Sequence, residues 1–114
     1  MKFTTSLNKN HEFKRLYNKG KSAASQCVVV YCRRNGRMAN RLGITVSTKI
    51  GGAVQRNRIR RRLKEIYRLN EDKLATGYDI VIVARMKSRY IGYRELESSV
   101  LAIFNKLNLS KRTE

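Results

Sequence analysis

The chain has 114 residues, of which 41% are hydrophobic, so it is long enough for one domain with a modest core. That hydrophobic content excludes a charged disordered tail. The charge is unusual, because 26 Lys and Arg face only 8 Asp and Glu, for a formal net charge of +18. Residues 1–64 carry 17 basic residues and one acid (+16), whereas residues 65–114 carry nine and seven (+2). Self-repulsion on this scale favours a dense, extended, negative partner, and nucleic acid fits best.

The sequence also bears on the cellular compartment of the protein and on whether disulfide bonds or zinc stabilise its fold. No segment approaches the roughly 18 apolar residues of a membrane span, and the first residues lack the apolar run of a signal peptide. Cys27 and Cys32 are five positions apart in an expected strand, hence on opposite faces and roughly 16 Å apart, which is too far for a disulfide. No Cys/His set has zinc-ligand spacing. We therefore expect a reduced, cytoplasmic protein with no membrane partner.

The first expected element is a helix that begins near Asn10 and stops at Gly20. Phe13, Leu16 and Tyr17 recur at i, i+3 and i+4, which is the spacing of one helical face. Asn10 suits the N-cap position, and Gly20 suits the C-terminal stop. The pattern predicts an amphipathic helix.

Two strands are expected next. Residues 26–33 are rich in β-branched and aromatic residues on both faces, so both faces must meet other elements. Residues 41–48 alternate, with Leu42, Ile44 and Val46 toward the core. Whether the segment between the first helix and the end of this strand holds two strands or three stays open.

The second half supplies two helices around a strand. Residues 54–69 are expected to be helical, residues 76–84 form an apolar strand typical of a central position, and a last helix starts near Tyr93. The order α-β-β-β-α-β-α predicts an α/β (α+β) fold, with a small mixed sheet of about four strands sandwiched by helices. We expect residues 1–114 to form a single RNA-binding domain, with an ordered core over about 5–107 and a frayed tail at 108–114.

The central helix contains the most unusual stretch of the sequence, since five of the seven residues from Arg56 to Arg62 are arginine. Wound at 100° per residue, Ile59, Leu63, Ile66 and Tyr67 share one apolar face. The polar residues fall on the opposite face and on both flanks. The face opposite the core carries Asn57, Arg61, Lys64 and Arg68. One flank carries Arg58 and Arg62, and the other flank carries Arg60. Arg56 lies at the edge nearest the core.

A solvated charged face is the alternative explanation of such a run. A solvated helix normally mixes signs, because i,i+4 pairs of opposite charge stabilise it by about 0.3 kcal/mol each and like pairs cost as much. This helix has no acid before Glu65. It also favours arginine, whose planar fork binds phosphate oxygens bidentately. The pattern therefore favours an anion-binding ridge, and the absence of helix-turn-helix, zinc-finger or heptad patterns favours folded RNA over DNA.

The segment VSTKIGGAVQRNRIRRRLKE resembles the protein subunit of bacterial ribonuclease P. The family signature of a lysine, a glycine-containing turn and Ala-Val-x-Arg-Asn-Arg-Ile-(Lys/Arg)-Arg spans Lys49 to Arg61. The segments around Glu12-Phe13, LGITVS and YDIVIVAR are also similar to the family, so the resemblance covers about residues 5–107. The central motif is specific, whereas the outer segments alone would be weak.

The resemblance implies a three-layer fold in which the arginine helix joins two parallel strands by a left-handed crossover, against the usual right-handed preference. It also implies a function. Members of this family join a catalytic RNA subunit, and the complex removes the 5′ leader of precursor tRNA. The expected partners are therefore the RNA subunit and precursor tRNA, with no DNA.

The resemblance also assigns three RNA-binding surfaces to particular residues of this sequence. The RNA-subunit surface comprises Lys49, Arg56, Asn57, Arg58, Arg60, Arg61 and Lys64. The cleft for the single-stranded leader comprises Phe13, Tyr17 and Tyr31, although all three side chains could equally be core. A looser third surface comprises Arg85, Lys87 and Arg89. Lys64 stands where some relatives have arginine, and Arg62 where some have an apolar residue.

No catalytic site is expected in the protein itself. The eight acids are scattered and the single histidine, His11, sits beside Glu12 at a helix start, whereas nuclease metal sites need converging carboxylates. The chain should bind no cofactor alone, and Mg²⁺ in the complete enzyme should be held mainly by RNA. A purely structural RNA-binding protein and a DNA-binding regulator are the competing hypotheses.

Overall fold

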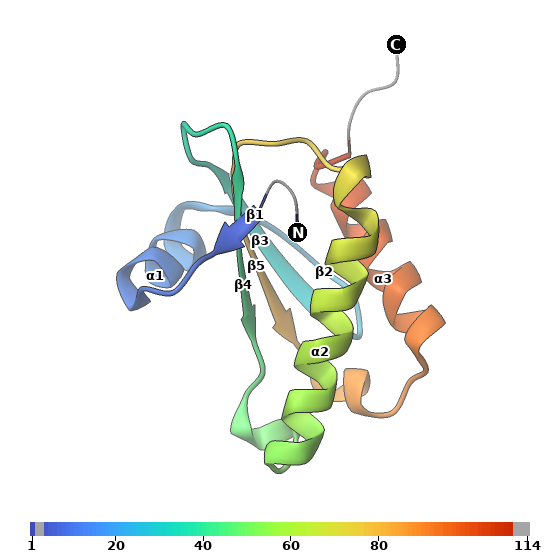
Figure 1. Ribbon diagram of the computed structural model, residues 1–114. Coiled ribbons are helices and arrows are strands. Elements are labelled where there is room, and N and C mark those ends of the chain that lie inside the picture. Colours follow the sequence, from blue (N-terminus) through green and yellow to red (C-terminus); the bar gives the residue numbers. More distant parts are fainter. Residues whose placement is uncertain (2–3, 111–114) are drawn as a thin grey trace.

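The computed structural model describes residues 1 and 4–110, and this part of the chain contains five strands, three α-helices and three short 3₁₀ helices (Figure 1). In chain order they are β1 (Thr4–Ser6), α1 (Asn10–Lys19), β2 (Lys21–Ala24), β3 (Val28–Arg34), β4 (Asn40–Thr45), η1 (Thr48–Ile50), α2 (Ala53–Asn70), η2 (Glu71–Lys73), β5 (Tyr78–Ala84), η3 (Met86–Arg89) and α3 (Tyr93–Lys106). The mixed α and β architecture is the one that the sequence predicts.

The strands form one mixed sheet in the order β1-β4-β5-β3-β2. β5 lies at the centre, and Ile80, Val81 and Ile82 in it are fully buried, as its continuous apolar run predicts. β4 pairs parallel with β5, and α2 is the connection between them. The resemblance implied this parallel pair, and the hand of the crossover stays a prediction.

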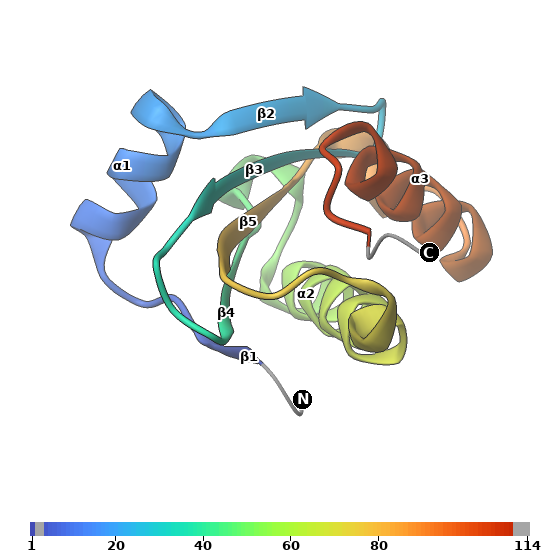
Figure 2. The ribbon, with the colours of Figure 1, turned by 90° about the horizontal axis from the view of Figure 1, so that it is seen from above.

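Helices cover both faces of the sheet, as Figure 2 shows from above. α2 and α3 lie on one face over the main hydrophobic cluster, to which β3, β4 and β5 contribute. α1 lies on the other face over a smaller cluster that contains Leu7, Leu16 and Val81. β3 therefore buries both of its faces, with Val28 and Val30 in the main cluster and Tyr31 against the smaller one.

The sheet has one strand more than the four or so predicted, and the first element is a strand that precedes the predicted helix. β1 precedes α1 and pairs parallel with β4 at the edge of the sheet. Its three residues, Thr4 to Ser6, are polar and largely exposed, so they carry no apolar alternation from which a strand could be predicted. β2 is the strand left open in the prediction, and it pairs antiparallel with β3 at the opposite edge.

The cysteine geometry also differs from the prediction. Cys27 and Cys32 are free thiols, and both are buried in the main cluster rather than on opposite faces. Cys27 lies just before β3, which begins at Val28, so strand alternation does not govern its side chain. Burial raises the pKa of the Cys32 thiol, although Lys21 acts in the opposite direction.

The packed chain extends past the predicted end of the core at residue 107. Leu109 is fully buried in the main cluster, and its backbone carbonyl accepts a hydrogen bond from Ala75 N at 2.7 Å. Ser110 forms an antiparallel bridge with Leu74. Residues 108–110 are therefore ordered against the fold, and residues 111–114 of the predicted tail lie outside the described residues.

The C-terminal end of α1 agrees with the prediction, whereas its N-cap residue differs from the predicted one. Gly20 ends the helix in an extended conformation, and a Cβ atom at Gly20 would lie 2.6 Å from the Leu16 carbonyl oxygen. Glycine is required there for close approach. At the other end, Asn10 is the first helical residue, and Lys9 occupies the N-cap without a side-chain hydrogen bond.

Candidate RNA-binding surfaces

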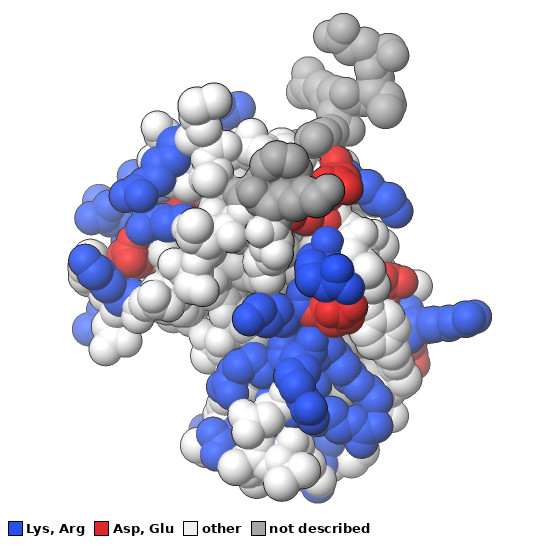
Figure 3. Space-filling view, viewed as in Figure 1, with Lys and Arg blue, Asp and Glu red and all other residues white. Residues whose placement is uncertain are grey.

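α2 buries the face that the helical wheel predicts and exposes its arginines. Ile59, Leu63, Ile66 and Tyr67 are at most 3% exposed, and they pack into the main cluster. The basic side chains cover the outer surface of α2, where they gather as a continuous patch in Figure 3. We call this patch the arginine ridge, and its members are Arg56, Asn57, Arg58, Arg60, Arg61 and Lys64.

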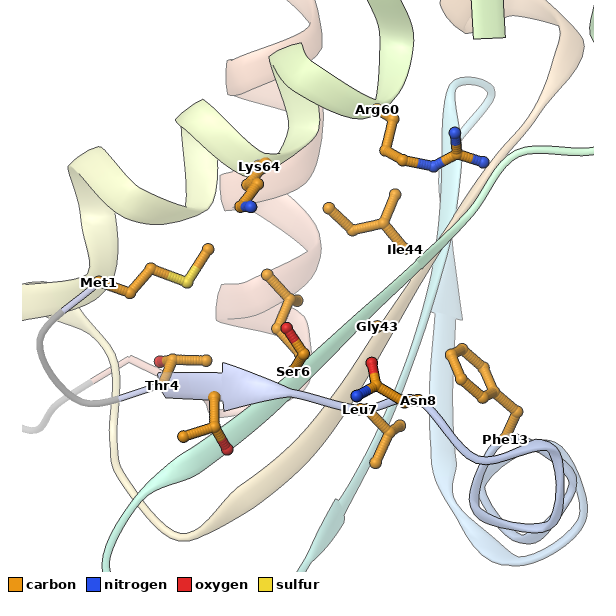
Figure 4. A pocket seen from close by; sticks show the side chains of 12 residues that line it. Met1, Thr4, Ser6, Leu7, Asn8, Phe13, Gly43, Ile44, Arg60 and Lys64 are labelled. Atoms are coloured by element: carbon orange, nitrogen blue, oxygen red, sulfur yellow. The ribbon is translucent and has the colours of Figure 1, made fainter. Parts of the chain in front are cut away.

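The two flanks of the ridge face different neighbours. Arg60 and Lys64 line a pocket of about 430 Å³ together with Thr4 to Ser6 of β1 and Phe13 of α1 (Figure 4). Arg58 lies on the other flank and lines a groove against η3. Between the flanks, a shallow hollow of about 530 Å³ runs along the crest past Asn57 and Arg61.

Two members of the ridge, Arg56 and Arg60, are half-buried, whereas the others are exposed. Arg56 is half-buried, at the core-side edge that the wheel predicts, and its Nε is buried without a hydrogen-bond partner in the described part of the chain. Lys49, by contrast, is exposed on η1, where its backbone amide donates to Ser47 Oγ at 3.2 Å. η1 packs against α2, so Lys49 belongs to the same side of the molecule as the ridge.

Phe13, Tyr17 and Tyr31, the three residues of the expected leader cleft, lie close together on the opposite face of the sheet. The ring centroids of Phe13 and Tyr17 are 6.5 Å apart, and those of Tyr17 and Tyr31 are 4.9 Å apart in an edge-to-face contact. Tyr17 is 40% exposed, whereas Phe13 and Tyr31 are half-buried against the smaller cluster. We call these three residues the aromatic groove, after the cleft that the resemblance implies, and a role in leader binding stays a prediction.

Close packing on β4 fixes the ring of Phe13. A Cβ atom at Gly43 would lie 2.6 Å from Phe13 Cζ, so this ring rests on bare backbone. Tyr17 is oriented by Thr45 on the same strand, with 3.4 Å between the two hydroxyl oxygens. The sheet therefore determines where both aromatic rings of α1 lie.

A cluster of charges fastens α1 to the sheet, and sequence reasoning missed it. Arg41 on β4 donates from Nη1 to the Glu12 carboxylate on α1, and from Nε and Nη2 to the two oxygens of Asp79 on β5, at 2.8 and 2.6 Å. Asn35 Nδ2 also donates to Asp79 Oδ1 at 3.0 Å. We call Glu12, Arg41 and Asp79 the α1 anchor.

The α1 anchor has a signal in the sequence that could have been used. Glu12 is the only acid among the first 64 residues, and Asp79 is the only charged residue of the segment YDIVIVA. A charged residue inside a buried strand needs a partner. Burial alone would raise the pKa of the Asp79 carboxyl, but hydrogen bonds from Arg41 and Asn35 outweigh it and hold the pKa below its ordinary value.

The third predicted surface is divided by the structure. The Arg85 guanidinium donates to the Ser25 carbonyl at 2.8 Å, and Lys87 Nζ donates to Gln26 Oε1 at 2.5 Å, so both lie beside the β2–β3 turn. Arg89 instead donates to the Ile50 carbonyl at 3.0 Å and lines the groove against α2. Arg89 therefore lies on the same side of the molecule as the arginine ridge, whereas Arg85 and Lys87 do not.

Within residues 1 and 4–110, no three His, Cys, Asp or Glu side chains come together as a metal site. None of the helices in this part of the chain is long and apolar enough to cross a membrane.

Comparisons with known proteins point to one family. The family model described as Ribonuclease P matches residues 1–108. The ribonuclease P protein component of Alkaliphilus oremlandii is 44% identical over 109 residues, which cover 96% of each chain. The RNase P protein of Staphylococcus aureus matches with a TM-score of 0.86 at 31% identity, over 93% of this chain and 97% of that one.

A second solved structure extends the comparison. The RNase P protein of Thermotoga maritima matches with a TM-score of 0.79 at 32% identity, over 90% of this chain and 94% of that one. Sequence and structure agree over nearly the full length in each case. The chain belongs to the ribonuclease P protein family.

Proposed function

We propose that this protein binds the catalytic RNA subunit of ribonuclease P and the 5′ leader of precursor tRNA, and so assists the endonucleolytic removal of the leader. The single observation that supports this most is the pairing of two surfaces, an arginine ridge on α2 and an aromatic groove beneath α1. The ridge, with Lys49, would dock on the RNA subunit. The groove of Phe13, Tyr17 and Tyr31 would receive the leader.

The ridge suits a folded RNA because its arginines have no acidic partners of their own. In the described part of the chain, the ion pairs on α2 are confined to Arg68 and Glu65, one turn beyond the ridge. Guanidinium groups bind phosphate oxygens bidentately, and RNA is recognised largely through its shape and backbone. Arg58, Arg60 and Arg61 would therefore position the protein on the RNA without reading its sequence.

The groove suits a single-stranded leader of variable sequence. An aromatic face accepts any base by stacking, at about 1–3 kcal/mol per base. Tyr17 is the most exposed of the three rings and offers such a face. Phe13 and Tyr31, which are half-buried, would form the walls of the groove.

We place the cleavage chemistry in the RNA subunit. Nucleases that act through two metal ions hold them with converging carboxylates, and the described residues provide no such cluster. The Mg²⁺ ions of the complete enzyme would be held mainly by RNA phosphates. The protein would contribute by neutralising phosphate charge and by holding the leader, and Arg85 and Lys87 would add peripheral RNA contacts.

Leader binding is tested by comparing precursor and mature tRNA. Tyr17→Ala combined with Phe13→Leu, which keeps an apolar side chain against Gly43, should weaken precursor binding to the complete particle by about 1–3 kcal/mol. Mature tRNA, which has no leader, should bind as before. Met38→Ala, at a side chain that is 93% exposed, is the matched control. Equal losses for both tRNAs would instead support a purely structural RNA-binding protein.

A further inference from the structure

A small groove between α2 and η3 combines an exposed aromatic ring with three guanidinium groups. It has a volume of about 290 Å³, and its lining includes Arg58, Ile59, Arg62, Ser88, Arg89 and Tyr90. We call it the Tyr90 pocket. It lies beside the N-terminal part of α2, where the chain turns from β5 toward α3 (Figure 1).

The ring of Tyr90 is presented to solvent on a fixed backbone. Its side chain is 70% exposed, which is unusual for a large aromatic residue. Its amide donates to the Lys87 carbonyl at 3.0 Å. The preceding Ser88 is 1% exposed and donates from Oγ to the Arg85 carbonyl at 2.7 Å. These contacts hold the backbone that carries the ring, and a tyrosine has only two side-chain torsions to fix on binding a partner.

Three cations converge on the same pocket. Arg58 and Arg62 are one turn apart on α2, and Arg89 comes from η3. Arg62 donates to the Ile91 carbonyl at 3.3 Å, and Arg89 donates to Ile50 while its guanidinium lies 5.4 Å from the Tyr90 ring centroid. Each of these hydrogen bonds uses one of five N–H donors, so both groups are positioned and keep donors for an oxyanion.

No carboxylate is among the described residues that line the pocket. The acid nearest along α2, Glu65, pairs with Arg68 instead. The pocket therefore presents three positive charges and one π face, and this combination matches a nucleotide, which has a flat base and flanking phosphates. Its volume is at the small end for ligand sites, which suits one unpaired nucleotide rather than a duplex.

We propose that the Tyr90 pocket binds one unpaired nucleotide of the RNA subunit, with its base on Tyr90 and its phosphates on Arg58, Arg62 and Arg89. This inference rests on the proposed function, since it requires that the chain bind a catalytic RNA. The RNA subunit is preferred over the tRNA leader because the pocket adjoins the arginine ridge. The aromatic groove lies on the other face of the sheet, under α1 (Figure 2).

The chain offers a direct probe of stacking, because it contains no tryptophan. Tyr90→Trp would carry the only indole, and titration with the RNA subunit should quench its emission in step with binding. Met86→Trp is the matched control, since Met86 is exposed on the same 3₁₀ helix and does not line the pocket; its emission should change little. Unchanged Tyr90→Trp emission at saturation would overturn the proposal.

Affinities for the RNA subunit give the second measurement. Tyr90→Ala should bind about 5- to 150-fold more weakly, which corresponds to the loss of one stacked base, and Tyr90→Phe should bind like the wild type because it keeps the ring. Leader oligonucleotides and mature tRNA should bind Tyr90→Ala and wild type equally.

The alternatives are distinguishable in the same experiment. A loss of affinity shared by tRNA, or equal quenching of Tyr90→Trp by poly-glutamate, would overturn the assignment to the RNA subunit. If wild-type protein fails to bind the RNA subunit at all, the proposed function itself is wrong. If wild type binds and Tyr90→Ala binds equally well, only the Tyr90 pocket is wrong.

Discussion

At the scale of single residues, the geometry of the aromatic groove depends on a few side chains that do not belong to it. Among the described residues, the smaller hydrophobic cluster under α1 has three buried members, Leu7, Leu16 and Val81. The α1 anchor adds a charged contact to this limited apolar one. Both carboxylates of the anchor are mostly buried, at 13–14% side-chain exposure, so breaking the anchor leaves charges without partners.

The first prediction concerns Asp79 and pH. Its pKa is lowered in the folded protein, so its contribution to stability is complete above the unfolded pKa of about 4 and is lost as pH falls through the folded pKa. Asp79→Asn should therefore lower the free energy of unfolding at neutral pH by about 1.5–3 kcal/mol. Denaturant titrations at several pH values should show the difference from wild type narrowing below about pH 4; a constant difference would contradict the anchor.

The second prediction concerns Gly43, on which the Phe13 ring rests. The Cβ atom of Gly43→Ala would lie 2.6 Å from that ring, so the ring must move, at a cost of about 1–3 kcal/mol in unfolding free energy. Precursor tRNA should bind more weakly while mature tRNA binding is kept. Gly92→Ala is the control, because a Cβ atom there meets nothing within 4 Å. Unchanged precursor affinity would show that the ring position does not matter.

At the scale of elements, the helical periodicity of apolar residues predicts α2 and α3, and a continuous apolar run predicts the central β5. The apolar face of α2, for example, is given by Ile59 and Leu63 with the expected spacing. β1 could not be predicted in this way, since an edge strand of three polar residues is specified by its pairing with β4. The aromatic groove was located only through the family resemblance, because its three residues come from two separated segments.

The third prediction concerns the charge of α2. Arg58→Glu with Arg61→Glu should abolish binding of the RNA subunit, because repulsion replaces attraction at the centre of the ridge. The circular-dichroism spectrum should stay unchanged, since both side chains are exposed. Lys73→Glu with Lys106→Glu makes the same change in net charge at exposed positions outside α2 and should retain binding. Equal losses in both variants would indicate a general effect of charge and not of the ridge.

At the scale of the whole molecule, the net charge of +18 is unevenly distributed along the chain. The +16 of residues 1–64 includes the whole ridge, so the repulsion is concentrated where RNA is proposed to bind. Composition predicts this imbalance and the kind of partner. It does not predict where each guanidinium group is held, because that depends on local contacts such as those of Arg85 with Ser25 and Arg89 with Ile50.

The fourth prediction follows from this concentration of charge. Inorganic pyrophosphate should raise the melting temperature of the free protein more than sodium chloride at equal ionic strength, because it binds the folded ridge. A gain of 1 kcal/mol corresponds to a shift of about 4 °C or more for a domain of this size. The Arg58→Glu, Arg61→Glu variant should gain less, and an equal gain would place the bound anions elsewhere.

We propose that the protein assists an RNA catalyst and does not cleave RNA itself. The most direct test is the cleavage of a 5′-labelled precursor tRNA at low Mg²⁺ concentration by the protein, by the RNA subunit, and by both together. We expect no cleavage with protein alone, slow cleavage with RNA alone, and fast release of the intact leader with both. Cleavage by the protein alone, or a rate with RNA that the protein does not change, would contradict it.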